Sequence, residues 1–120
     1  MFPFRRRPAR VTPADARQRT RDGAAVLLDV RERAEWTAGH APGAVHAPLS
    51  ALLAGADLPR AARGRPLMAI CRSGHRSQRA ARLLTERGAG AVVDITGGMN
   101  AWAAAGLPVV DGHGNHGSIA

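Results

Sequence analysis

The only cysteine of the chain, Cys71, lies where an apolar segment meets a polar loop, in the stretch MAICRSGHRSQRAARLL (residues 68–84). Arg72 and Arg76 lie in that loop, and Gly74 lets it adopt a backbone conformation that other residues avoid. A thiol reacts as its thiolate, and a free thiol with the ordinary pKa of about 8.5 is mostly protonated at neutral pH. Backbone N–H groups at the start of a following helix, together with the two guanidinium groups, can stabilise that anion. The sequence therefore predicts that Cys71 is a nucleophile, provided that solvent reaches the thiol.

Other interpretations of these polar residues stay open at this point. A cysteine at a strand end can also be a small apolar core residue without chemistry. His75 could respond to pH or select a substrate, although we favour a solvent-facing loop position for it. Asp29 and Arg31 follow a second apolar segment. We expect them to brace a loop or to form an ion pair, because a thiolate nucleophile needs no catalytic base.

The charge of the chain is strongly positive but unevenly distributed. Its 17 basic residues are all arginines and face 9 acidic ones, which gives a net charge of +8 at pH 7. Arg5, Arg6, Arg7 and Arg10 lie within the first ten residues, where there is no acid. Arginine without lysine is typical of a GC-rich coding sequence, and no aromatic residues alternate with the arginines as in a single-strand binder. We therefore expect no nucleic-acid partner.

The single cysteine also bears on compartment and cofactors. One cysteine cannot form an internal disulfide, which favours a reducing compartment, and we expect a cytoplasmic protein. The start MFPFRRRPAR has no following apolar segment of the kind that marks a signal peptide, and no run reaches the length of a membrane span. One cysteine and scattered histidines lack zinc-ligand spacing. We therefore expect no metal, no cofactor and no membrane partner.

The elements that must position Cys71 alternate between strands and helices. The runs AAVLLDV (24–30), PLMAIC (66–71) and AVVDIT (91–96) are almost continuously apolar, which is typical of parallel strands covered on both faces. Helical segments follow them, and Thr12 and Pro13 mark the start of a further helix. In such α/β sheets, ligands bind outside the carboxyl ends of the strands, where Cys71 lies. We expect a basic arm at 1–10, one domain at 11–110 and a flexible tail at 111–120.

Four separated motifs resemble those of the rhodanese family of sulfurtransferases. They are LLDVRERAEW, GHAPGAVHAP, CRSGHRS and GGMNAWAAAGLPV, in the same order as in that family. The resemblance implies an α/β fold with a roughly five-stranded parallel sheet and helices on both faces. It also implies that Cys71 carries a sulfane sulfur as a persulfide. Arg72 would then meet a small anionic donor such as thiosulfate, Arg76 would close the loop, and the N–H groups from Ser73 to Ser77, including those of Gly74 and His75, would hold the terminal sulfur.

The resemblance leaves three functional classes open. The first is an enzyme that transfers sulfur to cyanide or to a thiol, possible acceptors including a sulfur-accepting protein, and that acts as a monomer or weak dimer. The second is a persulfide relay or adaptor domain for a protein partner. The third is a phosphatase or arsenate reductase of the same fold, which is recognised by a loop one residue longer between the cysteine and the arginine. Only residues 72–75 separate Cys71 from Arg76, so the spacing favours sulfur chemistry.

Overall fold

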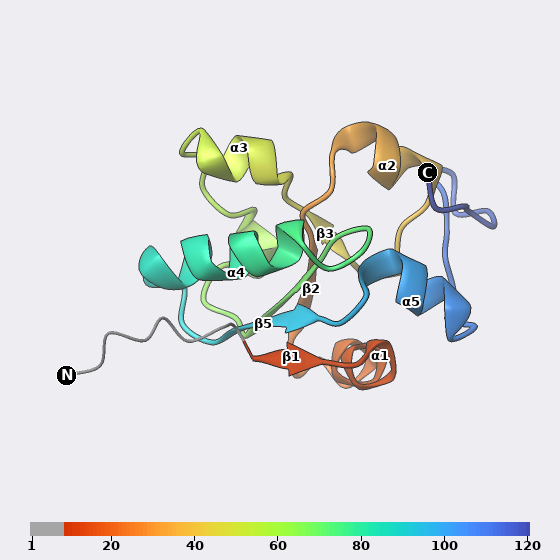
Figure 1. Ribbon diagram of the computed structural model, residues 1–120, viewed down its shortest axis with the longest axis horizontal. Coiled ribbons are helices and arrows are strands. Elements are labelled where there is room, and N and C mark those ends of the chain that lie inside the picture. The colour runs from red at the N-terminus through yellow and green to blue at the C-terminus, as the bar shows by residue number, and fades with distance from the viewer. Residues whose placement is uncertain (1–8) are drawn as a thin grey trace.

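The computed structural model describes residues 9–120 and consists of short strands that alternate with helices (Figure 1). In chain order the elements are β1 (Arg10–Val11), α1 (Pro13–Arg21), β2 (Val26–Asp29), α2 (Arg33–Ala38), β3 (Val45–His46), α3 (Leu49–Leu53), the 3-10 helix η1 (Arg60–Ala62), β4 (Leu67–Ile70), α4 (Arg76–Glu86), β5 (Val92–Ile95) and α5 (Gly98–Ala104).

The five strands form one parallel sheet in the order β1-β5-β4-β2-β3. Every residue of β4 is buried, as the continuous apolar pattern predicts for a strand covered on both faces. Because β4 is the middle strand, its carboxyl end lies between those of β5 and β2. The fold predicted from the sequence is confirmed, and it places the residue after β4 at the centre of the carboxyl edge.

Helices cover both faces of the sheet, and successive strand residues point to opposite faces. Leu28 and Leu67 pack in one core cluster with residues of α3, η1 and α4. Leu27 and Met68 pack in the other with residues of α1 and α5, including the fully buried Trp102. Figure 1 shows α3 and α4 on one side of the sheet and α1 on the other.

The predicted start of the first helix matches its capping geometry. The Thr12 side chain accepts a hydrogen bond from the Asp15 N–H at 3.1 Å, and Pro13 occupies the first helical position. Gly23 follows the end of α1 with a φ of 69°, a conformation that favours glycine. Helix α4 begins at Arg76, directly after the loop that follows Cys71.

The first described residues belong to the sheet and not to an arm. Arg10 lies in β1 opposite Asp94, and the Asp94 N–H donates to the Ala9 carbonyl at 2.8 Å. The sequence placed Arg10 in the basic arm because a two-residue edge strand leaves no apolar pattern. Arg5, Arg6 and Arg7 lie outside the described residues.

The carboxyl-terminal residues 111–120, which the sequence indicated as a flexible tail, instead fold back against α2. Val110 forms an antiparallel bridge with His116, and the Ser118 N–H donates to the Ala38 carbonyl at 3.0 Å. A Cβ at Gly39 would lie 2.3 Å from the Ser118 oxygen, so glycine is what permits this approach. The contact joins positions far apart in sequence, and no local pattern reports it.

Among the helices of residues 9–120, none is both long enough and apolar enough to cross a bilayer.

Candidate active site

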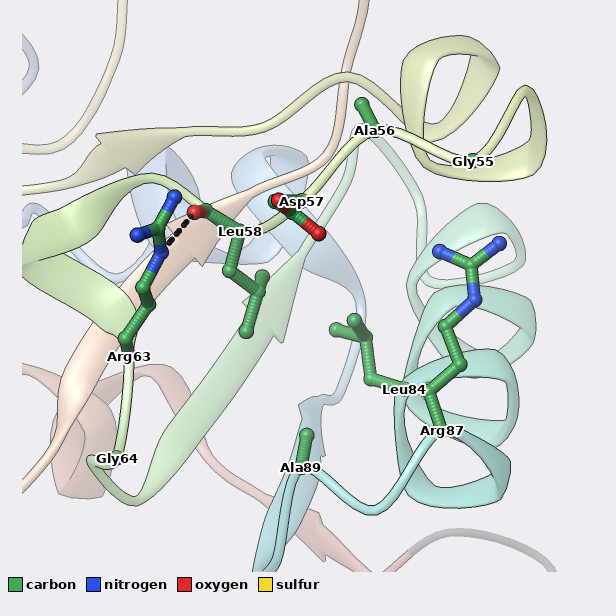
Figure 2. A pocket seen from close by; sticks show the side chains of 9 residues that line it. All are labelled: Gly55, Ala56, Asp57, Leu58, Arg63, Gly64, Leu84, Arg87 and Ala89. Carbon is green, nitrogen blue, oxygen red and sulfur yellow. Dashed lines mark hydrogen bonds between the residues drawn. The ribbon is translucent and has the colours of Figure 1, made fainter.

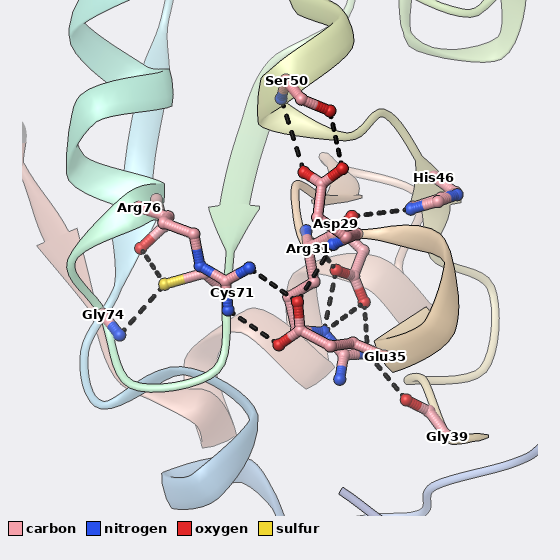
Figure 3. Close-up of polar contacts among 11 residues, drawn as sticks. Asp29, Arg31, Glu35, Gly39, His46, Ser50, Cys71, Gly74 and Arg76 are labelled. Atoms are coloured by element: carbon pink, nitrogen blue, oxygen red, sulfur yellow. Dashed lines mark hydrogen bonds and ion pairs between the residues drawn. The ribbon is translucent and has the colours of Figure 1, made fainter. Parts of the chain in front are cut away.

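Cys71 directly follows β4, at the centre of the carboxyl edge of the sheet (Figure 3). Its carbonyl accepts a hydrogen bond from the Met99 N–H at 2.7 Å, near the start of α5. A Cβ at Gly98 would lie 2.3 Å from that same carbonyl oxygen, so α5 can approach the cysteine only because position 98 is glycine. The second glycine of the GGMNAW motif therefore has a physical role next to the cysteine.

The Cys71 sulfur accepts one hydrogen bond and is the start of a chain of two more, through Ser77 to Asp94. The Gly74 N–H donates to Cys71 Sγ at 3.1 Å, and Gly74 has a φ of 103°, as its place in the loop required. The Cys71 thiol donates to Ser77 Oγ at 3.3 Å. Ser77 Oγ in turn donates to Asp94 Oδ1 on β5. The loop thus places the Gly74 N–H, and the first turn of α4 the Ser77 hydroxyl, against the sulfur.

The accessibility of the sulfur differs from the expectation. Cys71 is 1% exposed, whereas a nucleophile must meet its substrate. Gly74, which donates to the sulfur, is also buried, while Arg72, Ser73 and His75 point outward and are exposed. In this conformation the thiol is closed off from solvent, with the buried Gly74 in contact with Sγ, so any reaction at Cys71 requires a local rearrangement.

Arg76 is bound to a carboxylate that the sequence did not single out. Its Nη1 and Nη2 donate to the two carboxylate oxygens of Glu35 on α2, at 2.6 and 2.7 Å. Chiefly because of these bonds, the pKa of Glu35 falls from its ordinary value of 4.5 to about 2, and the pKa of Arg76 is raised. Arg76 therefore ties the first turn of α4 to α2. The side chain of Arg72 forms no hydrogen bond within residues 9–120 and is the arginine left to face solvent beside the loop.

Asp29 and Arg31 form a fully buried ion pair at the end of β2. Arg31 Nη2 lies 2.8 Å from Asp29 Oδ2, and both side chains are 0% exposed. Arg31 Nη2 also donates to the Gly39 carbonyl at 2.6 Å, beyond the end of α2. The pair connects the end of β2 to the residue that follows α2, the helix that carries Glu35. Arg31 Nη1 is buried without a partner among the described residues.

An aromatic stack holds the same helix from outside. The Trp36 ring stacks on His40 with ring centroids 3.6 Å apart and on His46 at 4.8 Å. His46 Nε2 also contacts the Arg31 carbonyl at 2.8 Å. Together with the buried pair, these contacts set the position from which Glu35 reaches Arg76.

A cavity of about 580 Å³ lies at the other end of the sheet (Figure 2). It is bordered by Gly64 before β4 and by Arg87 after α4, on an apolar floor that includes Leu84. Its lining contains neither cysteine nor histidine. Across residues 9–120, no group of three or more His, Cys, Asp or Glu side chains is arranged to hold a metal ion. The cavity and Cys71 thus occupy different regions of the protein.

Sequence reasoning missed three residues of this site: Arg10, Glu35 and Asp94. Asp94 had a detectable signal, because a carboxylate within an apolar strand must find a partner when it is buried. Arg10 supplies that partner, with its Nε 2.6 Å from Asp94 Oδ2. Glu35 carries no comparable signal, because its partner is 41 positions away and both side chains are partly exposed.

The parallel α/β sheet with helices on both faces is the fold of solved rhodanese-related structures. The chain belongs to the rhodanese-like domain family, whose model matches residues 12–105. The recognition made from the four motifs is confirmed.

Solved structures of similar fold include sulfurtransferases. The thiosulfate sulfurtransferase from Pseudomonas aeruginosa is 25% identical with a TM-score of 0.78, the match covering 96% of this chain and 22% of that one. The human single-domain sulfurtransferase TSTD1 is 28% identical with a TM-score of 0.67, over 81% of this chain and 96% of that one. A Rhodopseudomonas palustris protein of unknown function, described as a possible tyrosine phosphatase, is 29% identical with a TM-score of 0.71, over 85% and 84% of the two chains.

Proposed function

We propose that this protein is a sulfurtransferase that moves a sulfane sulfur from a small anionic donor such as thiosulfate to a thiol or cyanide, through a persulfide on Cys71. One observation carries the proposal: the lone thiol lies at the start of α4, with the Gly74 N–H directed at its sulfur. Helix starts and converging N–H groups favour an anion there. A free thiol that cycles through a persulfide also favours a reducing compartment such as the cytoplasm.

The reaction has two balanced half-reactions. The Cys71 thiolate attacks the outer sulfur of thiosulfate, the new Sγ–S bond forms, and the S–S bond to the sulfonate breaks, with its electron pair leaving on sulfite. The acceptor then attacks the outer sulfur of the persulfide. Cyanide leaves as thiocyanate, a thiol leaves as a persulfide, and the Cys71 thiolate is regenerated. Neither half-reaction calls for a metal or an organic cofactor.

The loop residues have distinct proposed roles. Arg72 attracts the anionic donor, because its guanidinium is exposed beside the cysteine, whereas Arg76 is engaged by Glu35. Once the loop has moved to admit the donor, the N–H groups from Ser73 to Ser77 hold the transferred sulfur. Asp29 and Arg31 keep α2 in place for the Glu35 contact.

The two alternatives use the same cysteine. A persulfide relay to an acidic partner protein is compatible with the exposed Arg72 and Arg79 near the loop. Phosphatase or arsenate reductase chemistry is disfavoured by the short segment 72–75, because a tetrahedral phosphate needs a wider loop. A panel of thiosulfate, an aryl phosphate and arsenate separates sulfur chemistry from phosphatase or arsenate reductase chemistry.

Steady-state transfer of sulfur from thiosulfate to cyanide tests the proposal. We expect turnover by the wild-type chain and none above background by Cys71→Ser, with Arg63→Ala, at the distant cavity, as a control that retains activity. Turnover by Cys71→Ser would overturn the mechanism. Phosphate release without sulfur transfer would favour the phosphatase alternative.

A further inference from the structure

The side chain of Asp94 lies in the core behind the sulfur, where the transfer reaction just proposed gives it no part. Asp94 and Ser77 are both 0% exposed. Asp94 Oδ1 accepts a hydrogen bond from the Ser77 hydroxyl, and Asp94 Oδ2 accepts one from Arg10 Nε at 2.6 Å. The chain of contacts thus runs from the thiol through a hydroxyl and a carboxylate to a guanidinium.

The direction of these bonds follows from counting protons. A serine hydroxyl has one proton to donate, and an ionised carboxylate only accepts. Because the ion pair with Arg10 keeps Asp94 ionised, its carboxylate accepts the hydrogen bond that the single Ser77 proton can form. Ser77 Oγ can then offer Cys71 only a lone pair, so that bond exists when the sulfur carries its own proton. A thiolate would instead need the Ser77 proton for itself.

We infer that Asp94 is a positioning residue that holds the Ser77 hydroxyl proton away from the sulfur and thereby keeps Cys71 in the thiol form while the loop is closed. Cys71 and Asp94 compete for one proton donor. The inference rests on the proposed function only for its effect on the reaction, because the thiolate is the form that attacks the sulfur donor. The contacts themselves are independent of any substrate.

Arg10 links this device to the loop. Its Nη2 donates to the Gly74 carbonyl at 3.4 Å, while its Nε binds Asp94. Gln78 donates to the same Gly74 carbonyl at 2.6 Å. The residue whose N–H holds the sulfur is therefore connected through its carbonyl to the cation that neutralises Asp94. Movement of Gly74 breaks the sulfur contact and the Arg10 contact together.

Other charged groups near the sulfur are arranged differently. Arg72 and His75 extend from the exposed loop, and Arg76 is engaged by Glu35 from α2. At the end of β2, Asp29 and Arg31 neutralise each other in the core. None of these side chains forms a hydrogen bond to the Cys71 thiol or to Ser77 Oγ within the described residues, which leaves Asp94 as the charged group that acts on the hydroxyl.

The substitution Asp94→Asn reverses the direction of the hydrogen bonds that link Asp94, Ser77 and Cys71. The amide oxygen can still accept from Arg10, and its NH₂ then donates to Ser77 Oγ, which frees the Ser77 proton for the sulfur. The chain has one cysteine and no tyrosine, so thiolate absorbance in the ultraviolet can be titrated without interference from tyrosinate. We expect Asp94→Asn to lower the titration midpoint of Cys71 by about one pH unit, which raises the thiolate fraction below the midpoint about tenfold. Asp57→Asn makes the same change of carboxylate to amide at an exposed position in the distant cavity, and it should leave the titration midpoint of Cys71 unchanged.

Removing a negative charge near the sulfur would by itself favour the thiolate, so the Ser77→Ala background separates the two causes. We expect Asp94→Asn to shift the midpoint by less than about 0.3 units when Ser77 is already alanine. An equal shift in both backgrounds would assign the effect to charge alone and overturn the inference.

Ser77→Ala alone provides a test that does not depend on the folding of Asp94→Asn. The hydroxyl lone pair that accepts from the thiol is then lost, so we expect the midpoint to fall. A rise would mean that Ser77 donates to the thiolate, and it would overturn the inference. Persulfide formation from thiosulfate, recorded on the same samples, reports separately on the proposed function. A shifted midpoint without persulfide contradicts only that function, whereas persulfide with an unshifted midpoint contradicts only the role of Asp94.

Discussion

The two ends of the sheet differ in shape and in chemistry. Active sites usually lie in cavities, but here the cavity is at one end of the sheet and the thiol is at the other. At the amino end of β4 lies an open cavity of about 580 Å³, bordered by exposed arginines whose N–H groups bond to backbone carbonyls. At the carboxyl end there is a loop beside a thiol that is 1% exposed, together with the fully buried pair of Asp29 and Arg31 and the half-buried pair of Arg10 and Asp94. The proposed chemistry thus lies where polar groups converge, and it requires the loop to open before a substrate can bind.

Stability should separate the two ends most strongly. Removing Arg31 with an Arg31→Ala substitution leaves the Asp29 carboxylate buried without its partner, and loss of one member of a buried pair costs about 3–5 kcal/mol. Arg87→Ala at the cavity removes an exposed side chain and should cost about 1 kcal/mol or less. Urea unfolding of both variants measures the difference. Equal losses would show that the buried pair does not brace the carboxyl end.

The Glu35–Arg76 pair should make the stability of the active end depend on pH. Folding lowers the pKa of Glu35 from 4.5 to about 2, so the unfolded chain binds more protons between those values. The contribution is therefore fully present above about pH 4.5 and is lost as the pH falls toward about 2. Because the pair is partly exposed, we expect it to be worth about 1 kcal/mol.

Unfolding curves of Glu35→Gln and wild type, compared between pH 5 and pH 2.5, measure this contribution. The two should differ at the upper pH and converge at the lower one. Glu86→Gln, which changes an exposed carboxylate at the far end of α4, provides the matched control. A constant difference across the range would mean that the ionised form of Glu35 is not what joins α2 to α4.

The smallest expected effect concerns how the donor is attracted. We expect Arg72→Ala to raise KM for thiosulfate about threefold to tenfold, which corresponds to about 1 kcal/mol, and to change KM for an uncharged persulfide donor much less. The difference should shrink at high salt because exposed charges are screened. Arg63→Ala, which removes an equal charge at the cavity, should change neither value. An equal rise for both donors would assign Arg72 a role other than charge attraction.

Local patterns in the sequence were sufficient for the parts of the molecule that repeat them. The apolar runs of β2, β4 and β5 predicted a parallel sheet, and Thr12 and Pro13 predicted the start of α1. The position of Cys71 after an apolar strand also followed directly. These features depend on neighbours within a few residues, which is why one sequence suffices to find them.

Contacts between distant segments could not be predicted in the same way. Glu35 meets Arg76 only because Asp29, Arg31 and the Trp36 stack fix α2 in place. The burial of Cys71 depends equally on the fold, because a loop that can cradle an anion can also close over the sulfur. The approach of residues 111–120 to Gly39 depends on tertiary packing that has no periodic signal.

The most direct test of the central claim is the mass of the peptide that contains Cys71 after the protein has been incubated with thiosulfate and separated from it. We predict an increase of about 32 Da, one sulfur atom, that disappears when cyanide is added. The Cys71→Ser chain should show no increase. A peptide of unchanged mass after thiosulfate and several other sulfane donors would contradict the claim that this closed loop opens to load sulfur onto Cys71.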